Sequence, residues 1–357
     1  MTLTKTLVAL SLVLTGCACP FNHSQTKAYP RNQPIQQITD RVADSAMISL
    51  NPKRMMVIVA EPKTGKILAM SNTERGFILR GKYLNTEDPI ARIYEPSSTF
   101  KPLVAVAALQ EGKITPKTEI NCENGAFHFA GYIIRDQGKY GNLTFDEVLM
   151  KSSNIGAAKM ALMLKDSVYF DYVRRFGFGE KTGIPLPREE AGLVLPVERW
   201  DKLTKVRMAF GQSVAVTPLQ LTMFYCAIAN GGNLMKPRVG DEKPAVVRRV
   251  CSKKTANAVK NALANVVSDP VGAPLAKVNG VTVGGKTGTS PVITPDGQYS
   301  KDQFISSFAG FFPVEHPRYV CVVVVEEAHL KPAQNSGAQV AAPIFAEIAG
   351  KIMANEK

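Results

Sequence analysis

The chain has 357 residues, of which 45% are hydrophobic and 20% are charged, and its formal net charge is +13. A hydrophobic content this high lets most of the chain bury one large core. The positive charge suits an anionic membrane surface or an acidic polymer, but no helix-reading, zinc-finger or aromatic RNA motif accompanies it, so nucleic acid is excluded as an expected partner.

The amino end of the chain has the features of an export signal. It contains one Lys and an apolar run from Leu7 to Leu14, which is shorter than the about 20 residues that a membrane-spanning helix needs. The sequence LTGC resembles the lipobox of bacterial lipoproteins, and it predicts removal of residues 1–16 and lipid attachment at Cys17. An ordinary secretory signal or an uncleaved short anchor is the alternative. In each case we expect the folded part on the extracytoplasmic side of a bacterial membrane, held there by the lipid if Cys17 carries one.

A polar stretch follows the signal. Its sequence, PFNHSQTKAYPRNQPIQQ, is rich in Asn, Gln and Pro and shows no apolar period, so residues 17–50 are expected to form a tether. Residues 51–357 are expected to form one domain, because no second linker is visible. The cysteines have no metal-ligand spacing, and neither a metal, a cofactor nor an obligatory disulfide is expected, although a pair between Cys122 and Cys251 stays open.

The expected elements of the domain begin with two strands, MMVIVA and KILAMS, joined by a turn at EPKTG. Three further strands, VTVGGKTGT, QFISSFAGFFP and RYVCVVVVEEA, precede a closing helix, GAQVAAPIFAEIAGKIMA. The segment between these two groups is mostly helical. This order predicts an α/β (α+β) fold, in which one sheet is assembled from both ends of the chain and helices pack on it.

The tripeptide KTG occurs three times, at 63–65, 181–183 and 286–288. The first lies in the hairpin turn, and the second lies in a Gly- and Pro-rich connection, FGFGEKTGIPLP. The third lies in GVTVGGKTGTS, which also matches the phosphate-binding pattern GxxxxGK[ST]. A phosphate loop needs a helix directly after its Lys-Thr pair, whereas Gly288 and Pro291 follow here and the valines before it alternate as in a strand. Nucleotide binding is therefore not expected.

Ser98 and Lys101 lie three residues apart in YEPSSTFKPLVAVAALQEG, at the start of a helix that is expected to run to about Gln110. A serine hydroxyl needs a base to become a nucleophile. Lys101 is the available base if burial and a second cation, such as Lys286, keep its amine neutral. The alternative is that Ser97 and Ser98 only cap the helix and that Lys101 is solvated.

A second polar motif lies in NLTFDEVLMKSSNIGAAKMALML. Thr144 and Glu147 form a capping box that starts a short helix, and this places Ser152 and Asn154 in the turn before the next helix. A hydroxyl there suits a proton relay and an amide suits a peptide substrate, unless the turn is an ordinary polar one. SxxK, SxN and KTGT occur in this order with spacings of 54 and 134 residues, and the three together are far more specific than any one of them.

Together these motifs resemble the transpeptidase domain of class B penicillin-binding proteins, and most of all its division-type members. The likeness covers about residues 51 to 350 and includes VIVAEPKTGKILAM, YEPSSTFKP, RDQGKYGNLTFDEVLMKSSNIG, RFGFGEKTGIPLP, AFGQSVAVTPLQL, GGKTGT and SSFAGFFP. It implies a β-lactamase/transpeptidase-like fold, with a five-stranded antiparallel sheet, helices on both sides and a mostly helical subdomain. It also implies a peptidoglycan D,D-transpeptidase that β-lactams acylate.

The resemblance assigns roles to individual residues. Ser98 would attack the penultimate D-alanine of a peptidoglycan stem peptide, with Lys101 as general base. Ser152 and Lys286 would pass the proton to the leaving amine. Asn154 would hold the amide on the acyl side of the substrate, and the amine of a second stem peptide would then take the acyl group.

The resemblance also assigns substrate binding to the KTGT segment. Lys286, Thr287 and Thr289 would bind the substrate carboxylate, and the backbone amides of Ser98 and Thr289 would form the oxyanion hole. The donor peptide would lie along residues 283–290 as an added strand, in space left by glycines. These glycines are Gly284, Gly285 and Gly288.

Two features depart from the family pattern. The family usually has Gly directly before the nucleophile, whereas this chain has Ser97, which is also a rival nucleophile. Class B members normally carry a transmembrane helix and an amino-terminal pedestal domain, and neither is recognised here. A glycan polymerase and divisome proteins are thus candidate partners only, and a division or an elongation role stays open. Three other functions stay open as well: D,D-carboxypeptidase, serine β-lactamase and non-catalytic penicillin-binding scaffold.

Overall fold

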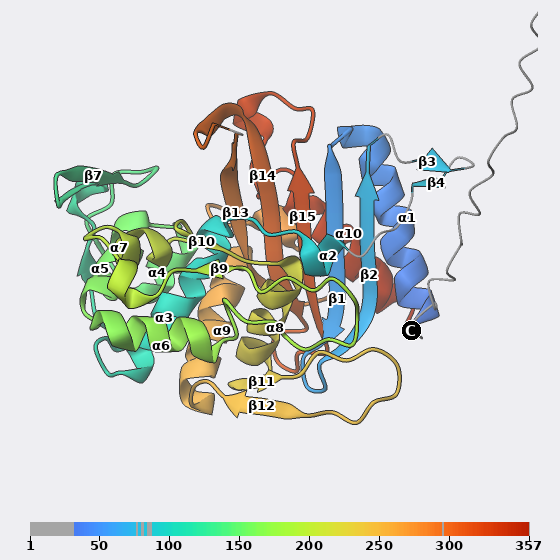
Figure 1. Cartoon of the computed structure of the whole chain (residues 1–357), viewed down its shortest axis with the longest axis horizontal. Helices are drawn as coiled ribbons and strands as arrows, with labels where there is room; N and C mark the ends of the chain where they lie inside the picture. Colours follow the sequence, from blue (N-terminus) through green and yellow to red (C-terminus); the bar gives the residue numbers. More distant parts are fainter. Residues whose placement is uncertain (1–31, 76–77, 80–81, 84–87, 295, 357) are drawn as a thin grey trace, which may run out of the picture.

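The computed structural model describes residues 32–75, 78–79, 82–83, 88–294 and 296–356. The expected signal sequence and Cys17 lie outside these residues. A five-stranded antiparallel sheet forms the centre of the domain and is built from both ends of the chain, in the order β13–β14–β15–β1–β2 (Figure 1). Its strands are β1 (Arg54–Glu61), β2 (Lys66–Glu74), β13 (Gly284–Ile293), β14 (Tyr299–Phe312) and β15 (Tyr319–Glu326). The expected fold class is confirmed.

Helices cover both faces of this sheet. On one side α1 (Gln33–Leu50) packs on β1 and β2, and it contacts α10 (Ala341–Ala354), which packs on β14 and β15. On the other side α8 (Pro218–Ala229) packs on β1, β14 and β15, and α9 (Lys253–Ser268) packs on β13. Every residue of β15 is buried, because both faces of this strand are covered.

The helix α1 corrects the expected tether. Residues 17–50 are expected to be a polar linker, but residues 33–50 form this helix, which is part of the folded domain. The side chain of Asn32 caps it by accepting from the backbone N–H of Ile35 at 3.2 Å. Its outer face is mostly polar, although Ile48 is exposed there, while its inner face buries apolar residues at helical spacing. These are Ile35, Val42, Ala43, Ala46 and Met47.

The same helix closes the outer edge of β2. The side-chain amide of Gln36 acts like a neighbouring strand, since its Nε2 donates to Met70 O at 3.1 Å and its Oε1 accepts from Met70 N at 3.0 Å. The Asn32 N–H donates to Leu68 O at 3.1 Å. An uncovered edge strand would offer such groups to another chain. The opposite edge strand, β13, pairs with β14 alone, so β13 is the edge at which a peptide strand can add.

Gln36→Ala is expected to lower the free energy of unfolding by about 1–3 kcal/mol, because the buried N–H and C=O of Met70 lose the hydrogen bonds that Gln36 makes with them. Urea denaturation measures this change. Gln37→Ala is the matched control, since Gln37 is exposed on the same helix, and its expected effect is below about 0.5 kcal/mol. Equal unfolding midpoints for the two variants would contradict the role of α1 as an edge cover.

The middle of the chain forms a mostly helical part beside the sheet (Figure 1). Its main helices are α3 (Lys101–Gln110), α4 (Phe145–Met150), α5 (Asn154–Leu162), α6 (Asp166–Arg175) and α7 (Thr204–Ala209), whereas the short helix α2 (Asp88–Ala91) lies against β1, β2 and α8. Short 3-10 helices are η1 (Ser97–Phe100), η2 (Glu123–Gly125), η3 (Val197–Arg199), η4 (Pro274–Ala276) and η5 (Pro332–Gln334). Short paired strands are β3 (Ile78–Leu79), β4 (Lys82–Tyr83), β5 (Ile120–Asn121), β6 (Ala126–Phe129), β7 (Tyr132–Arg135), β8 (Asn142–Leu143), β9 (Leu193–Val194), β10 (Val214–Ala215), β11 (Asn233–Met235) and β12 (Val246–Arg249).

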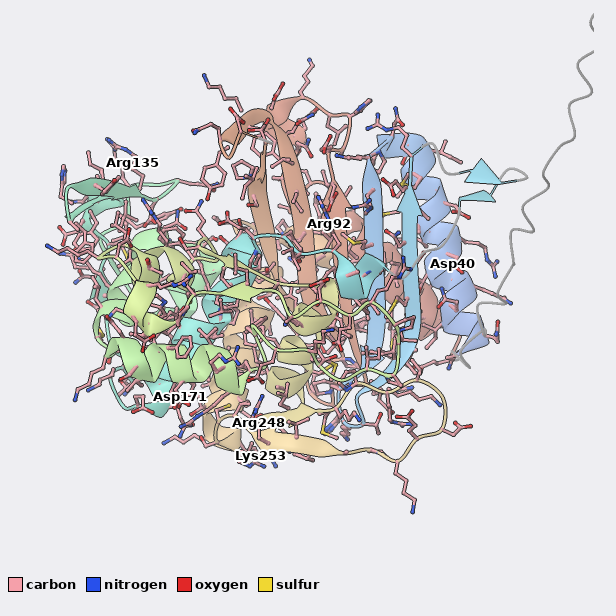
Figure 2. The ribbon with its side chains drawn as sticks, viewed as in Figure 1. Asp40, Arg92, Arg135, Asp171, Arg248 and Lys253 are labelled. Carbon is pink, nitrogen blue, oxygen red and sulfur yellow. The ribbon has the colours of Figure 1, made fainter. Side chains whose placement is uncertain are left out.

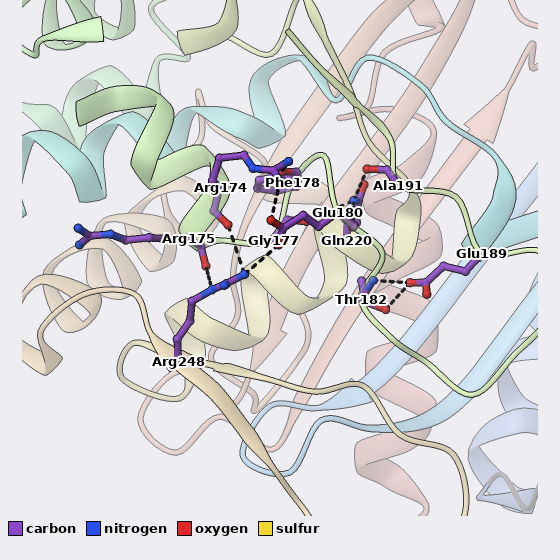
Figure 3. Close-up of polar contacts among 10 residues, drawn as sticks. All are labelled: Arg174, Arg175, Gly177, Phe178, Glu180, Thr182, Glu189, Ala191, Gln220 and Arg248. Carbon is purple, nitrogen blue, oxygen red and sulfur yellow. Dashed lines mark hydrogen bonds and ion pairs between the residues drawn. The ribbon is translucent and has the colours of Figure 1, made fainter. Parts of the chain in front are cut away.

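The second KTG tripeptide, residues 181–183, is a structural connection, as predicted (Figure 3). Glu189 Oε1 accepts from the backbone N–H of Thr182 at 2.6 Å and from its hydroxyl at 2.5 Å. Gln220 on α8 donates from Nε2 to the carbonyl oxygen of Glu180 at 2.8 Å. These contacts bind the segment to the rest of the domain.

Two further expectations concern the membrane and the thiols. In the described ranges, no helix has the length and the apolar character to pass through a membrane. Four cysteines fall in these ranges and are buried free thiols, so the Cys122–Cys251 pair is not formed. Burial raises the pKa of the Cys251 thiol to about 11.

Candidate active site

The SxxK motif lies where the helical part meets the sheet. Ser98 is in η1, which leads directly into α3 at Lys101. Phe100 is fully buried beneath this turn. The hydroxyl of Tyr225 on α8 donates to Thr99 O at 3.0 Å. These contacts hold the turn in place. Because one of them comes from α8, the packing of α8 helps to set the position of Ser98.

Ser97 connects this turn to the sheet. Its backbone is left-handed, with φ 49°, which costs a residue other than glycine about 1–2 kcal/mol. Its N–H donates to Gly211 O, and its Oγ donates to Thr289 O on β13, both at 3.0 Å. A Cβ on Gly211 would lie 2.0 Å from Ser97 O, so glycine is required there. Ser97 stands where the resemblance leads us to expect Gly; it adopts the left-handed backbone, and its hydroxyl contacts β13.

The amine of Lys101 is the centre of the site. Its Nζ lies 2.8 Å from Ser98 Oγ, 2.7 Å from Ser152 O and 3.1 Å from Ser152 Oγ. It also lies 2.8 Å from Asn154 Oδ1. A carbonyl oxygen and an amide oxygen only accept hydrogen bonds. In a neutral amine they therefore take the two hydrogens and leave its lone pair for the hydroxyl of Ser98, which is the arrangement that a serine nucleophile would need from its base.

The charge state of this amine follows from its surroundings. Lys101 and Lys286 are 0% and 1% exposed. Burial lowers the pKa of Lys101 well below its usual value, the positive charge of Lys286 lowers it further, and the negative charge of Asp136 opposes both. Burial lowers the pKa of Lys286 to about 7. These directions agree with the expectation that burial and Lys286 keep Lys101 neutral.

Ser152 of the SxN motif lies in the turn between α4 and α5, as predicted, whereas Asn154 is the first residue of α5. The capping box of Thr144 and Glu147 starts α4. Ser153 caps α5 through a hydrogen bond that its Oγ accepts from the third residue of that helix at 2.9 Å. Ser152 has a left-handed backbone, with φ 55°, and both its carbonyl and its hydroxyl contact Lys101. The structure thus brings Ser98, Lys101, Ser152 and Asn154 together.

One acid beside this turn is not indicated by the three motifs. Asp136 follows β7, and its carboxylate accepts from the hydroxyl of Ser153 at 2.6 Å and from the N–H of Asn154 at 2.5 Å. In the sequence its only signal is its place in RDQGKYGNLTFDEVLMKSSNIG, upstream of the SxN motif.

The KTGT motif lies on β13, next to η1. The Nζ of Lys286 donates to Thr287 O at 3.4 Å and to Thr287 Oγ1 at 3.3 Å. Within the described part of the chain, no hydrogen bond joins Lys286 to Ser152. Thr287 and Thr289 line the cleft of the site, whereas Gly288 does not.

The glycines of β13 serve packing inside the protein, which corrects the expectation that they leave room for a substrate. A Cβ on Gly284 would lie 2.6 Å from a phenylalanine ring of β14, and a Cβ on Gly285 would lie 2.5 Å from another. A Cβ on Gly288 would lie 2.5 Å from Ser307 Oγ. The neighbouring strand therefore fills the space that these residues leave.

A second residue that the motifs do not indicate is Gly337, on the loop before α10. Its N–H donates to Thr289 Oγ1 at 3.0 Å. A Cβ on Gly337 would lie 2.3 Å from Gly288 O and 2.4 Å from Ser307 O, so only glycine fits against β13. Because the hydroxyl of Thr289 already accepts from Gly337, its own hydrogen remains for a ligand in the cleft.

A cleft of about 590 Å³ lies between the helical part and β13. β7 forms its outer wall, where Tyr132 is 57% exposed and the guanidinium of Arg207 lies 5.4 Å from the centre of the Tyr132 ring. Figure 2 shows Arg135 at the end of β7, on the outer side of the helical part. Where the structure describes the chain, no three His, Cys, Asp or Glu side chains are grouped to hold a metal ion. The expected residues that line the cleft are Ser98, Ser152, Asn154, Lys286, Thr287 and Thr289.

Known proteins whose sequences are similar to this chain belong to one family. The family model described as penicillin binding protein transpeptidase domain matches residues 55–350. Stage V sporulation protein D of Bacillus subtilis is 34% identical over 335 residues, which are 88% of this chain and 51% of that protein. Peptidoglycan D,D-transpeptidase FtsI of Escherichia coli is 29% identical over 327 residues, which are 90% of this chain and 55% of that protein. The chain spans about half the length of these curated relatives.

Solved structures agree with the sequence relatives. The apo transpeptidase domain of penicillin-binding protein 3 from Burkholderia pseudomallei superposes with a TM-score of 0.84 at 30% identity, over 92% of this chain and 96% of that one. Penicillin-binding protein 3 from Mycobacterium tuberculosis, in complex with aztreonam, gives a TM-score of 0.79 at 30% identity, over 90% and 77% of the two chains. This chain therefore belongs to the penicillin-binding protein transpeptidase family, and its domain is of the class B type.

Proposed function

We propose that this domain is a serine D,D-transpeptidase that cross-links the stem peptides of peptidoglycan. The observation that carries the proposal is the buried amine of Lys101, which lies 2.8 Å from Ser98 Oγ while its other neighbours accept its hydrogens. The relative from Escherichia coli that is named peptidoglycan D,D-transpeptidase supports stem peptides as the substrate.

In the first half of the reaction, Ser98 Oγ attacks the carbonyl carbon of the penultimate D-alanine, and its proton passes to Lys101 Nζ. The backbone N–H groups of Ser98 and Thr289 hold the oxyanion, and each such donor is worth about 3 kcal/mol in the transition state. The C–N bond to the terminal D-alanine then breaks, and the proton from Lys101 goes to that amine, which leaves. Ser152 Oγ lies 3.0 Å from Ser98 Oγ and 3.1 Å from Lys101 Nζ, so it relays this proton.

In the second half, the amine of another stem peptide attacks the ester on Ser98. It gives its proton to Lys101 and forms the new amide bond, and Ser98 Oγ regains a proton as it leaves. A D,D-carboxypeptidase would use water in place of this amine. A β-lactam acylates Ser98 in the same way as the donor peptide, but no C-terminal residue departs to make room for the acceptor.

Substrate binding in this proposal uses both sides of the cleft. Lys286, Thr287 and Thr289 bind the carboxylate of the donor peptide, which adds as a strand to the edge of β13 that lies opposite β14. The Nδ2 of Asn154 donates one hydrogen to Arg135 O at 3.0 Å, and its second hydrogen binds the amide on the acyl side of the donor.

Labelling of the purified full-length chain with a fluorescent penicillin tests the proposed chemistry. We expect a covalent label that persists for hours when excess unlabelled penicillin is added. Rapid turnover of the label would instead indicate a serine β-lactamase, and the absence of any label would indicate a non-catalytic scaffold. A stem peptide ending in D-Ala-D-Ala, incubated with and without an acceptor amine, then separates cross-linking from hydrolysis by water.

We also propose that the chain is exported and is anchored to a bacterial membrane by a lipid on Cys17, with its domain on the extracytoplasmic side. The LTGC sequence and the formal net charge of +13, which favours an anionic surface, support this location. A labelled fatty acid is expected to be incorporated into the wild-type chain and not into Cys17→Ser. Equal incorporation into both would contradict the anchor. A glycan polymerase and divisome proteins remain the candidate partners at that membrane.

A further inference from the structure

Asp136 holds the SxN turn from outside. The residue follows β7, and its Oδ1 accepts from the backbone N–H groups of Asn154 at 2.5 Å and of Ile155 at 3.1 Å. Its Oδ2 accepts from the hydroxyl of Ser153 at 2.6 Å. The first N–H groups of a helix have no partner within the helix, and a carboxylate beside them also interacts favourably with the helix dipole. One side chain thus fixes three consecutive residues at the start of α5.

These three residues directly follow a residue that needs support. Ser152 has a left-handed backbone, which is strained for a residue other than glycine and persists only where its surroundings enforce it. Asn154 is held twice from the same segment, because its N–H donates to Asp136 and its Nδ2 donates to Arg135 O. The end of β7 therefore determines where the oxygens of Ser152 and Asn154 lie relative to Lys101.

Resting on the function proposed above, we propose that Asp136 is a positioning residue of the active site: its carboxylate presents Ser152 and Asn154 to the amine of Lys101. It does not touch Lys101 itself, and it acts through the turn. A displacement of this turn by about 1 Å would move two of the oxygens that orient the amine, and misplacements of this size cost roughly 100-fold in rate.

The charge of Asp136 adds a second effect that a purely structural residue would lack. Two charged side chains act on Lys101, Lys286 from β13 and Asp136 from the end of β7, and they act in opposite directions. The titratable groups that feel the charge of Asp136 on its other sides are Cys122 and Tyr140, whose pKa values are raised, mainly by burial. Removal of the negative charge alone should therefore make Lys101 lose its proton at a lower pH.

Two substitutions separate the contacts of Asp136 from its charge. Asp136→Asn keeps the shape, since the amide oxygen can accept from the two N–H groups and the amide nitrogen can donate to the hydroxyl of Ser153. We expect its acylation by penicillin to keep a plateau close to that of the wild type, with the acidic limb of the pH profile about one pH unit lower. Asp136→Ala loses the contacts, and we expect a plateau rate roughly 100-fold lower.

The controls are Asp171→Asn, an acid on α6 that pairs with Arg175 at the surface, and thermal unfolding of every variant. Asp171→Asn is expected to leave the pH profile unchanged. The titration of Lys101 is also followed by NMR of the lysine-labelled protein, with its signal assigned through Lys101→Arg, so that a result is obtained even if no acylation occurs. Failure of the wild type to react would defeat the proposed function alone. An unshifted Lys101 titration in Asp136→Asn, or a normal acylation rate in Asp136→Ala, would overturn the role of Asp136.

Discussion

Ser98→Ala is expected to abolish covalent labelling by penicillin, with a loss of at least about 10⁴-fold in acylation rate, because the nucleophile acts as a unit with its base. Three serine hydroxyls lie near the turn, and their contacts tell them apart. The Oγ of Ser98 is the closest to Lys101 Nζ, at 2.8 Å, and it also accepts from Ser152 Oγ at 3.0 Å. The hydroxyl of Ser97 faces Thr289 O instead. Mass spectrometry of the labelled peptide measures the site of attachment.

The other two serines serve as matched controls. Ser97→Ala is expected to keep the label, with a rate lower by about tenfold or less, because one hydrogen bond between the turn and β13 is lost. Ser152→Ala is expected to keep the label on Ser98 but to form it about 10²-fold to 10⁴-fold more slowly, since the proton relay is missing. A label that persisted in Ser98→Ala and disappeared in Ser97→Ala would show that Ser97, and not Ser98, is the nucleophile.

The strands of the sheet could be predicted, and the three motifs could be recognised, because their sequence signals are local. The run RYVCVVVVEEA is apolar throughout and bounded by charges, and it forms the fully buried β15. The capping box of Thr144 and Glu147 is likewise visible in the sequence and present in the structure. The grouping of Ser98, Lys101 and Ser152 could also be predicted, and the structure brings the three side chains into contact; their roles as nucleophile, base and relay stay a proposal.

The parts that could not be predicted depend on contacts between distant segments. In the sequence the residues of α1 resemble part of a polar tether. Gln36 takes the place of a neighbouring strand only when the fold brings it beside Met70, and the sequence does not show this contact. The glycines of β13 suggest space for a ligand until the rings of β14 are placed against them. Asp136 is one acid among many in the sequence. Its importance is visible only in the structure, where it follows β7 and forms hydrogen bonds with the residues at the start of α5. Local patterns carry no information of this kind.

Lys101→Arg is expected to lower the acylation rate by about 10²-fold to 10⁴-fold at every pH, the range that a positioned general base contributes. A guanidinium keeps its proton, so it cannot take the proton of Ser98. In the wild type the rate should rise with pH as Lys101 loses its proton. Because burial and Lys286 lower the pKa of Lys101, this rise occurs well below the usual range of a lysine. Stopped-flow acylation across the pH range measures both effects.

Lys286→Gln tests the direction in which the charge of Lys286 shifts the pKa of Lys101. Without the positive charge of Lys286, the ammonium form of Lys101 is less disfavoured, so its pKa rises and the acidic limb moves to higher pH, by about one unit. This shift is opposite to the one expected for Asp136→Asn. Weaker binding of the substrate carboxylate would lower the rate at each pH without moving the limb, so the two effects of Lys286 separate. If Lys101→Arg, shown to be folded by its thermal transition, reacted within about tenfold of the wild type, Lys101 would not be the base, and the lysine pair would only shape the cleft.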